Sequence, residues 1–163
     1  MVTVRFNAAE IFEIAEQIER NGAKFYRKAA TMFSDPDICK LFVRLAEWEA
    51  EHEKTFAEMR NRILASNVAS TSFRPEETLP DPKVMAGLAV FGIRAEPREE
   101  LNGRENRVDI LRRAVEKEKD SIVFYHGLKD FLSDATDREQ VDRIIAEEMR
   151  HVRTLGESLK QME

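Results

Sequence analysis

The sequence predicts an all-α protein, a bundle of four helices made of two similar antiparallel hairpins. Three observations predict this fold. Apolar residues recur at alternating steps of three and four, which is the period of one helix face. Charged residues make up 35 % of the 163 residues, with only 6 glycines and 5 prolines, a composition typical of long amphipathic helices. The second half of the chain also repeats the first at a single offset.

The first hairpin is expected to span about residues 7–65. Its first helix should begin at Asn7, a good N-cap residue that Glu10 extends into a capping box. A turn at residues 34–36 ends this helix, and Pro36 suits the first turn of the next one. Because the turn is short, the two helices should be antiparallel neighbours.

A crossover of about residues 66–104 joins the two hairpins. Residues 66–82 contain three prolines and break the helical pattern, although a short apolar helix is expected at about 81–91. The second hairpin spans about 105–163, with its turn near residues 133–136. One long connection between two tight hairpins is typical of ferritin-like bundles, so residues 1–163 should form a single domain.

The two hairpins are related by an offset of 99 residues without a gap. The offset pairs residues of matching type: Glu19 with Glu118, Tyr26 with Tyr125, Glu49 with Glu148, and His52 with His151. Chance similarity between charged helices would not readily place two of the three histidines in one register. We interpret the repeat as a duplicated hairpin, so the bundle should have an approximate two-fold axis.

Six titratable residues interrupt the apolar stripes that should form the core. Each half has one Glu-x-x-His pair on one helix and a single Glu on the other. These residues are Glu19, Glu49, His52, Glu118, Glu148 and His151. Burying a lone charge costs on the order of several kcal/mol, and no Lys or Arg shares these stripes. Residues three apart share a helix face, so the pattern predicts a carboxylate-bridged pair of metal ions.

Small and aromatic residues accompany this cluster. Gly22 and Ser121 stand three positions after the single glutamates, where a larger side chain would crowd the site. Tyr26 and Tyr125 lie two turns beyond the same glutamates. They are either hydrogen-bonding partners of the ligands or large core residues, and the sequence favours neither interpretation.

Other conspicuous residues are given ordinary structural roles. Trp48 is interpreted as a packing residue rather than a redox relay, and His126 as a surface histidine because it lies off the core stripe. Cys39 is interpreted as an inert thiol. Four further glutamates are expected to be solvated: Glu51, Glu53, Glu116 and Glu147.

Several function classes are disfavoured. The net charge is −5 with Lys and Arg scattered along the chain, so we expect no nucleic-acid partner. The longest apolar stretch, residues 85–93, is too short to cross a bilayer. The first residues lack the blocks of a signal peptide, so a cytoplasmic location is expected. A single cysteine allows neither an intramolecular disulfide nor a Cys-x-x-Cys site.

At these positions the chain resembles the rubrerythrin branch of the ferritin-like di-iron superfamily. The matching segments are Glu19 with residues 22–26, then residues 49–54, 118–125 and 148–151. The resemblance implies a centre of two iron ions. By this likeness, Glu49 and Glu148 would bridge the ions and take part in catalysis. Glu19 and Glu118 would be terminal ligands, and His52 and His151 would give each ion one nitrogen.

The resemblance also implies a reaction with hydrogen peroxide or dioxygen, a cytoplasmic location and a dimer. Rubrerythrin proper carries an additional iron site of two Cys-x-x-Cys pairs, which a chain with one cysteine cannot form. A separate electron-donor protein is therefore expected. Ser121 stands where rubrerythrin has an extra glutamate, so the residue linked to carboxylate exchange in peroxide reduction is missing.

Two hypotheses of different class follow. The first is a di-iron oxidoreductase that oxidises Fe(II) with peroxide or dioxygen, in oxidative-stress defence or iron handling. The alternative is a non-catalytic metal-binding bundle with structural Zn(II) or mixed metals and a partner-binding role. Carboxylate and imidazole ligands suit Fe(II), Mn(II) and Zn(II), so the isolated protein could contain any of them. A homodimer is expected, with hairpins either closed within one chain or exchanged between two.

Overall fold

The structure is a computed structural model that describes residues 8–68, 101, 103–132 and 134–162. These residues form four long helices and one short 3-10 helix: α1 (Ala8–Ala30), α2 (Pro36–Val68), α4 (Arg107–Leu128), η2 (Lys129–Phe131) and α5 (Ala135–Lys160). No strand occurs in this part of the chain. The predicted all-α four-helix bundle is confirmed. The predicted N-cap Asn7 and the short helix expected at 81–91 lie outside the described residues.

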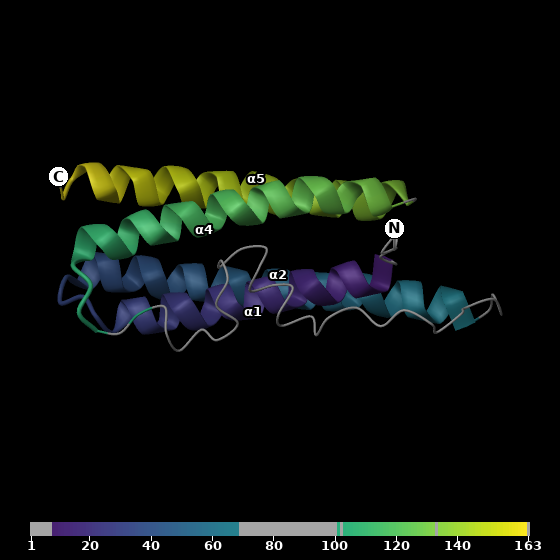
Figure 1. The fold of residues 1–163 in the computed structure, drawn as a ribbon, viewed down its shortest axis with the longest axis horizontal. Helices are drawn as coiled ribbons and strands as arrows, with labels where there is room; N and C mark the ends of the chain where they lie inside the picture. Colours follow the sequence, from purple (N-terminus) through teal and green to yellow (C-terminus); the bar gives the residue numbers. More distant parts are fainter. Residues whose placement is uncertain (1–7, 69–100, 102, 133, 163) are drawn as a thin grey trace, which may run out of the picture.

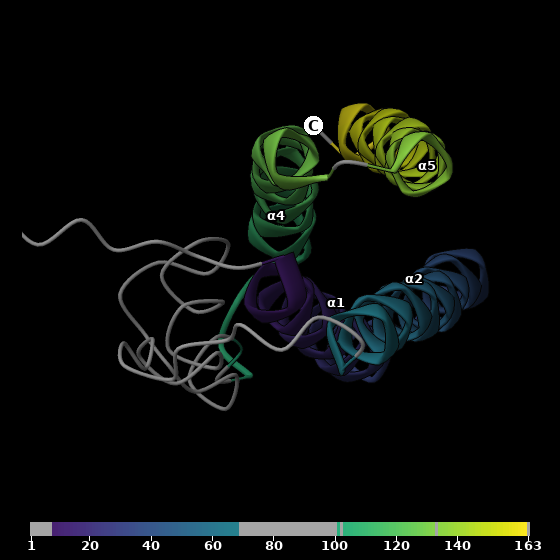
Figure 2. The same ribbon diagram turned by 90° about the vertical axis from the view of Figure 1, so that its right-hand side faces the viewer.

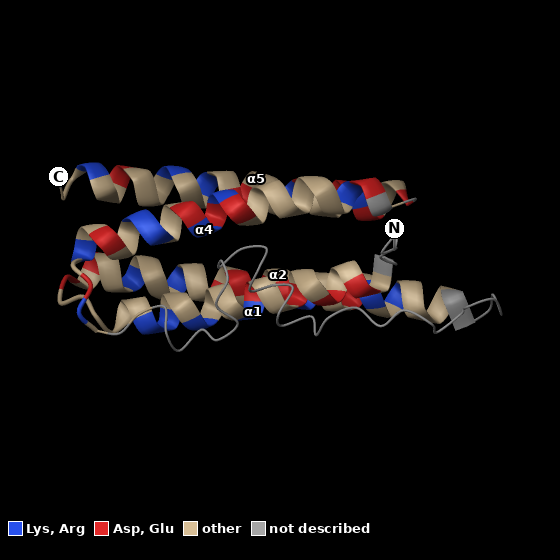
Figure 3. Cartoon of the chain, in the orientation of Figure 1, with Lys and Arg blue, Asp and Glu red and all other residues tan. Residues whose placement is uncertain are grey.

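The helices pack as two hairpins in two layers. Helices α1 and α2 lie side by side as one layer, and α4 and α5 form the other (Figure 1). The end view shows α4 above α1 and α5 above α2 (Figure 2). Acidic and basic residues are interspersed along all four helices instead of gathering on one of them (Figure 3).

The second helix of each hairpin begins in the same way. Asp35 Oδ1 accepts hydrogen bonds from the backbone N–H groups of Asp37 and Ile38, at 2.9 and 3.2 Å, just before α2. Asp134 caps α5 in the same way, accepting from two backbone N–H groups of its first turn. Pro36 is the first residue of α2, as predicted, because its missing N–H needs no partner there. Even the capping residues therefore follow the offset between the hairpins.

The apolar core is divided in two by the titratable residues. One cluster gathers around Phe12, Phe56 and Val141. The other gathers around Phe42 and Leu111. In each of the four long helices, the Glu or Glu-x-x-His lies between residues of one cluster and residues of the other. The polar layer is thus closed at both ends of the bundle by apolar side chains. None of the described helices combines the length and apolar content that a membrane crossing needs.

Candidate metal centre

The structure brings all six predicted residues together in the middle of the bundle. Every one of them is at most 4 % exposed. Their ligand atoms form two groups, each within 4.8 Å: Glu19, Glu49, His52 and Glu148 in one, and Glu49, Glu118, Glu148 and His151 in the other. Glu49 and Glu148 belong to both groups. This is the arrangement expected of two neighbouring positions that share two bridging carboxylates.

Both imidazole rings face the cluster through Nδ1. His52 Nδ1 lies 2.8 Å from Glu148 Oε1 and 3.5 Å from Glu19 Oε2. His151 Nδ1 lies 2.8 Å from Glu148 Oε2 and 3.6 Å from Glu118 Oε2. The two oxygens of Glu148 are therefore turned toward different histidines, and its carboxylate spans the gap between the two groups.

Several buried polar atoms of the cluster make no hydrogen bond, and even His52 Nδ1 and Glu148 Oε1, which lie 2.8 Å apart, are not aligned for one. The atoms are Glu19 Oε2, Glu49 Oε1, His52 Nδ1 and Glu148 Oε1. A buried polar group without a partner destabilises the fold by about 1–3 kcal/mol, and by more when it is charged. These unpaired atoms all belong to the two ligand groups. Divalent cations that bind oxygen and nitrogen would satisfy them, so the residues present fit a metal pair.

The carboxyl groups have strongly perturbed proton affinities. Burial raises the pKa of Glu49 and of Glu118 well above the usual range, and neighbouring carboxylates raise it further. The pKa of Glu148 is lowered instead. Burial would raise it, but the close approach of Glu118 and of both histidines outweighs burial. Without a cation, the cluster must therefore hold protons to limit the repulsion among its carboxylates.

The histidines retain protons for the same reason. Burial by itself would lower the pKa of His52, but the carboxylates of Glu19 and Glu148 raise it to about 12. Burial likewise opposes the charge of His151, and the adjacent carboxylates of Glu118 and Glu148 raise its pKa to about 9. Because a metal ion binds only the neutral imidazole, cations and these protons compete for the same atoms.

The two buried tyrosines bind ligands of the opposite hairpin. Tyr26 OH donates a hydrogen bond to Glu118 Oε1, and Tyr125 OH donates one to Glu19 Oε1. Burial and the adjacent carboxylates raise the pKa of both phenols, so both stay protonated as donors. Both rings also belong to the apolar clusters. The tyrosines are thus hydrogen-bonding partners as well as core residues.

Gly22 gives Glu49 the room that it needs. A Cβ atom added at Gly22 would lie 2.5 Å from Glu49 Oε2 and 3.1 Å from its Cδ. A real Cβ would therefore force the carboxylate away from its place. Ser121, at the equivalent position of α4, is buried as well. The expectation that a small residue is required at position 22 is confirmed.

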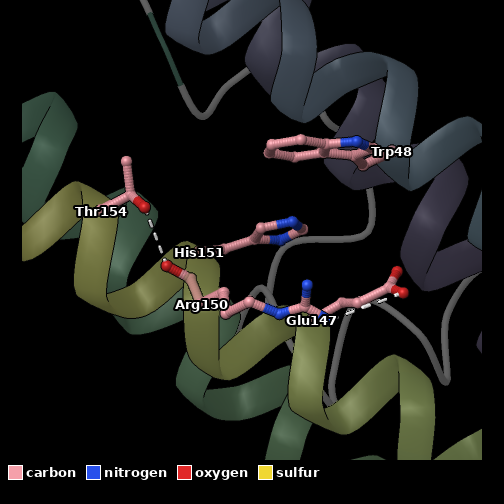
Figure 4. Close-up of a pocket in the computed structure, with 5 residues that line it drawn as sticks. All are labelled: Trp48, Glu147, Arg150, His151 and Thr154. Atoms are coloured by element: carbon pink, nitrogen blue, oxygen red, sulfur yellow. Dashed lines mark hydrogen bonds and ion pairs between the residues drawn. The ribbon is translucent and has the colours of Figure 1, made fainter.

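Trp48 and His151 form a stacked pair at the edge of the cluster. Their ring centroids are 4.9 Å apart and their planes differ by 10°. Together with Glu147, Arg150 and Thr154 they line a half-open cavity of about 300 Å³ (Figure 4). The indole is 40 % exposed, so it covers the histidine on the solvent side. This contact agrees with the packing role that we predicted for Trp48.

The structure also describes the other residues for which the sequence predicted ordinary roles. His126 is exposed, as expected, and the Sγ of half-buried Cys39 donates to the carbonyl oxygen of Phe33 at 3.1 Å. Glu51 and Glu116 are exposed, in agreement with their predicted solvation.

The side chains of Glu53 and Glu147 are partly exposed, at 26 % and 41 %, but each also makes a contact that was not predicted. Glu53 forms an ion pair with Arg20 at 2.7 Å, and Glu147 Oε2 lies 2.8 Å from His52 Nε2. Both side chains lie off the core stripe of their own helix but reach a residue on another helix. The sequence repeat could have indicated this role, because Glu147 is the counterpart of Trp48 and directly precedes Glu148, which belongs to both ligand groups.

Comparisons with known proteins agree with this geometry. A family model described as rubrerythrin matches residues 10–159. A solved structure described as a ferritin-like diiron-carboxylate protein, from Thermotoga maritima, is similar with a TM-score of 0.71 and 26 % sequence identity. The similarity covers 99 % of this chain and all of the other. The comparison with curated proteins finds no match.

Proposed function

Because this chain belongs to the rubrerythrin family, we propose that it is a di-iron carboxylate protein that oxidises Fe(II) with hydrogen peroxide or dioxygen. The family, the similar diiron-carboxylate structure and the buried cluster all support a di-iron protein. One observation carries the proposal furthest: two groups of four ligand residues share two glutamates at their centre.

The proposal assigns a role to each of the six residues. Glu49 and Glu148 would bridge the two ions because each belongs to both ligand groups. Each ion would also take one terminal carboxylate and one imidazole from the same hairpin: Glu19 with His52, and Glu118 with His151. Two iron ions held side by side would supply two electrons to one oxidant molecule.

The tyrosines would prepare the terminal carboxylates for this role. Tyr125 occupies Oε1 of Glu19, and Oε2 of Glu19 is left buried and without a hydrogen-bond partner. Tyr26 donates its hydrogen bond to Oε1 of Glu118, and Oε2 of Glu118 faces His151 Nδ1. Each hydroxyl thus fixes one oxygen and leaves the other directed at the cluster. A ligand that is already oriented loses less entropy when an ion binds.

The surroundings would favour a controlled reaction. Apolar clusters close both ends of the polar layer, which keeps bulk water away from it. A half-open cavity lies beside His151. The proposal further includes a separate electron-donor protein and a homodimer, both expected from the sequence. Peroxide or dioxygen would be the small-molecule substrate.

The proposal is tested by loading the metal-free protein with Fe(II) under anaerobic conditions and adding peroxide or oxygen. We expect two irons per chain and fast growth of the near-ultraviolet absorption of the diferric product. Glu49→Ala and Glu148→Ala should each abolish this growth because both positions lose a ligand. Glu116→Ala, which removes an exposed glutamate of α4, is the matched control and should react like the natural protein.

Two results would contradict the proposal. An undiminished rate in Glu49→Ala or Glu148→Ala would show that the oxidation occurs elsewhere. Tight binding of Zn(II) with no oxidation of Fe(II) would favour the alternative, a non-catalytic bundle with a structural metal. Metal content after purification does not decide between them, because Zn(II) binds such ligands more tightly than Fe(II) at equal availability.

A further inference from the structure

The two halves of the centre differ at one pair of equivalent residues. Trp48 in α2 and Glu147 in α5 are related by the offset of 99, and each directly precedes a bridging glutamate. Both side chains reach across the bundle to the histidine of the opposite hairpin. Trp48 stacks on His151, whereas Glu147 contacts His52. Equivalent positions therefore contribute an aromatic face on one side and a carboxylate on the other.

The Glu147 carboxylate orients the His52 ring. Its Oε2 lies 2.8 Å from Nε2 of His52, while Nδ1 of the same ring faces Glu148 and the cluster. When an ion holds Nδ1, the proton of the ring is on Nε2 and is donated to Glu147. A carboxylate that accepts this hydrogen bond fixes the tautomer and makes the imidazole a stronger ligand. Arg150 Nη2 lies 3.8 Å from the other oxygen of Glu147, on the exposed side.

The His151 ring is held in a different way. The described residues offer no hydrogen-bond acceptor to its Nε2, and its face is covered by the parallel indole of Trp48. The ring also lines the half-open cavity, together with Arg150 and Thr154 (Figure 4). Stacking restrains the plane of the ring but adds no negative charge to it.

We propose that Glu147 is a positioning residue that makes the two metal positions unequal. The position of Glu19 and His52 binds its ion more tightly and fills first. The position of Glu118 and His151 binds more weakly and lies beside the cavity. This inference rests on the metal pair of the proposed function, but it does not depend on any oxidation reaction.

Titration of the metal-free, full-length protein with Co(II) tests the inference. We expect two binding steps in the visible absorption of Co(II), of which His52→Ala removes the tighter and His151→Ala the weaker. Glu147→Ala should weaken the tighter step by about 10- to 100-fold, the usual cost of losing such a partner, and leave the weaker step unchanged. Glu147→Gln, which keeps one acceptor oxygen, should fall between. Glu157→Gln, an exposed change in α5, is the matched control.

Proton NMR of the Co(II)-loaded protein gives a readout that loss of stability alone would not move. Each bound imidazole contributes one strongly shifted N–H signal. The His52 signal should exchange slowly with water because Glu147 accepts its proton, and Glu147→Ala should accelerate that exchange alone. In the converse experiment, Trp48→Glu places a carboxylate at the equivalent position and should tighten the weaker step.

Three results would overturn the inference. They are two indistinguishable steps in the natural protein, equal weakening of both steps in Glu147→Ala, and an unchanged tighter step in that variant. If any of these results occurred while the protein still oxidised Fe(II), it would contradict only the unequal binding of the two ions and not the proposed function. Failure to bind any Co(II) would overturn the proposed function together with it.

Discussion

Replacement of Gly22 by alanine should disable both metal positions with one methyl group. The added Cβ would lie 2.5 Å from Glu49 Oε2, whereas ordinary contact begins at 3.4 Å. The carboxylate would therefore have to retreat by about 1 Å. Metal–ligand distances tolerate deviations of only about 0.2 Å, so a displaced Glu49 would no longer reach the ions. Since Glu49 belongs to both ligand groups, neither position would escape.

The size of the effect follows from this geometry. Loss of an outer hydrogen-bonding partner weakens metal binding by about 10- to 100-fold, and loss of a bridging ligand should cost at least as much. Folding should suffer far less. Alanine favours the helix over glycine by about 1 kcal/mol, which offsets part of the strain that the displaced carboxylate causes. We therefore expect Gly22→Ala to remain folded and to bind Co(II) poorly.

The assay compares this variant with a matched change in the same bundle. A Cβ added at Gly156 in α5 would meet nothing within 4 Å. Gly156→Ala should therefore raise the free energy of unfolding by about 0.5–1 kcal/mol and bind metal normally. Co(II) titration and denaturant unfolding of both variants measure the two effects. Wild-type Co(II) affinity in Gly22→Ala, at both steps, would refute the steric reasoning.

Two further predictions concern protons and hydrogen bonds at the centre. Tyr26→Phe leaves Glu118 Oε1 buried without its donor, so it should lower the free energy of unfolding of the metal-free protein by about 1–3 kcal/mol. Tyr125→Phe should have the same effect through Glu19. Urea denaturation measures both changes, and an unchanged free energy of unfolding in either variant would contradict the prediction. The second prediction rests on the pKa of His151, raised to about 9, and of His52, raised to about 12. Their protonated forms stabilise the metal-free fold fully below about pH 6.5, and the His151 contribution is lost as pH rises through about 9. Loading two ions near neutral pH should release at least two protons, measured with an indicator in weak buffer, and the apparent affinity should rise with pH; a pH-independent affinity would contradict this account.

The sequence predicted the cluster because helical register alone decides which residues share a core face. Glu49 and His52 interrupt an apolar stripe, and that interruption is visible without knowledge of any neighbouring helix. The partners of the cluster were harder to predict. The contact of Glu147 with His52 depends on how far apart α2 and α5 lie, and Tyr26 needed the placement of α4 before its hydroxyl had an identified acceptor. The spacing of residues along one helix gives no information about the distance from that helix to its neighbours.

The duplicated hairpin bears on how such a centre becomes asymmetric. Each hairpin supplies one Glu and one Glu-x-x-His, so a hairpin paired with an identical copy of itself would present the same six ligands. In such a pair, every substitution would appear twice and both sides would stay alike. Joining the copies in one chain lets a single codon change one side alone. The contrast between Trp48 and Glu147 is the kind of difference that only the joined chain can hold.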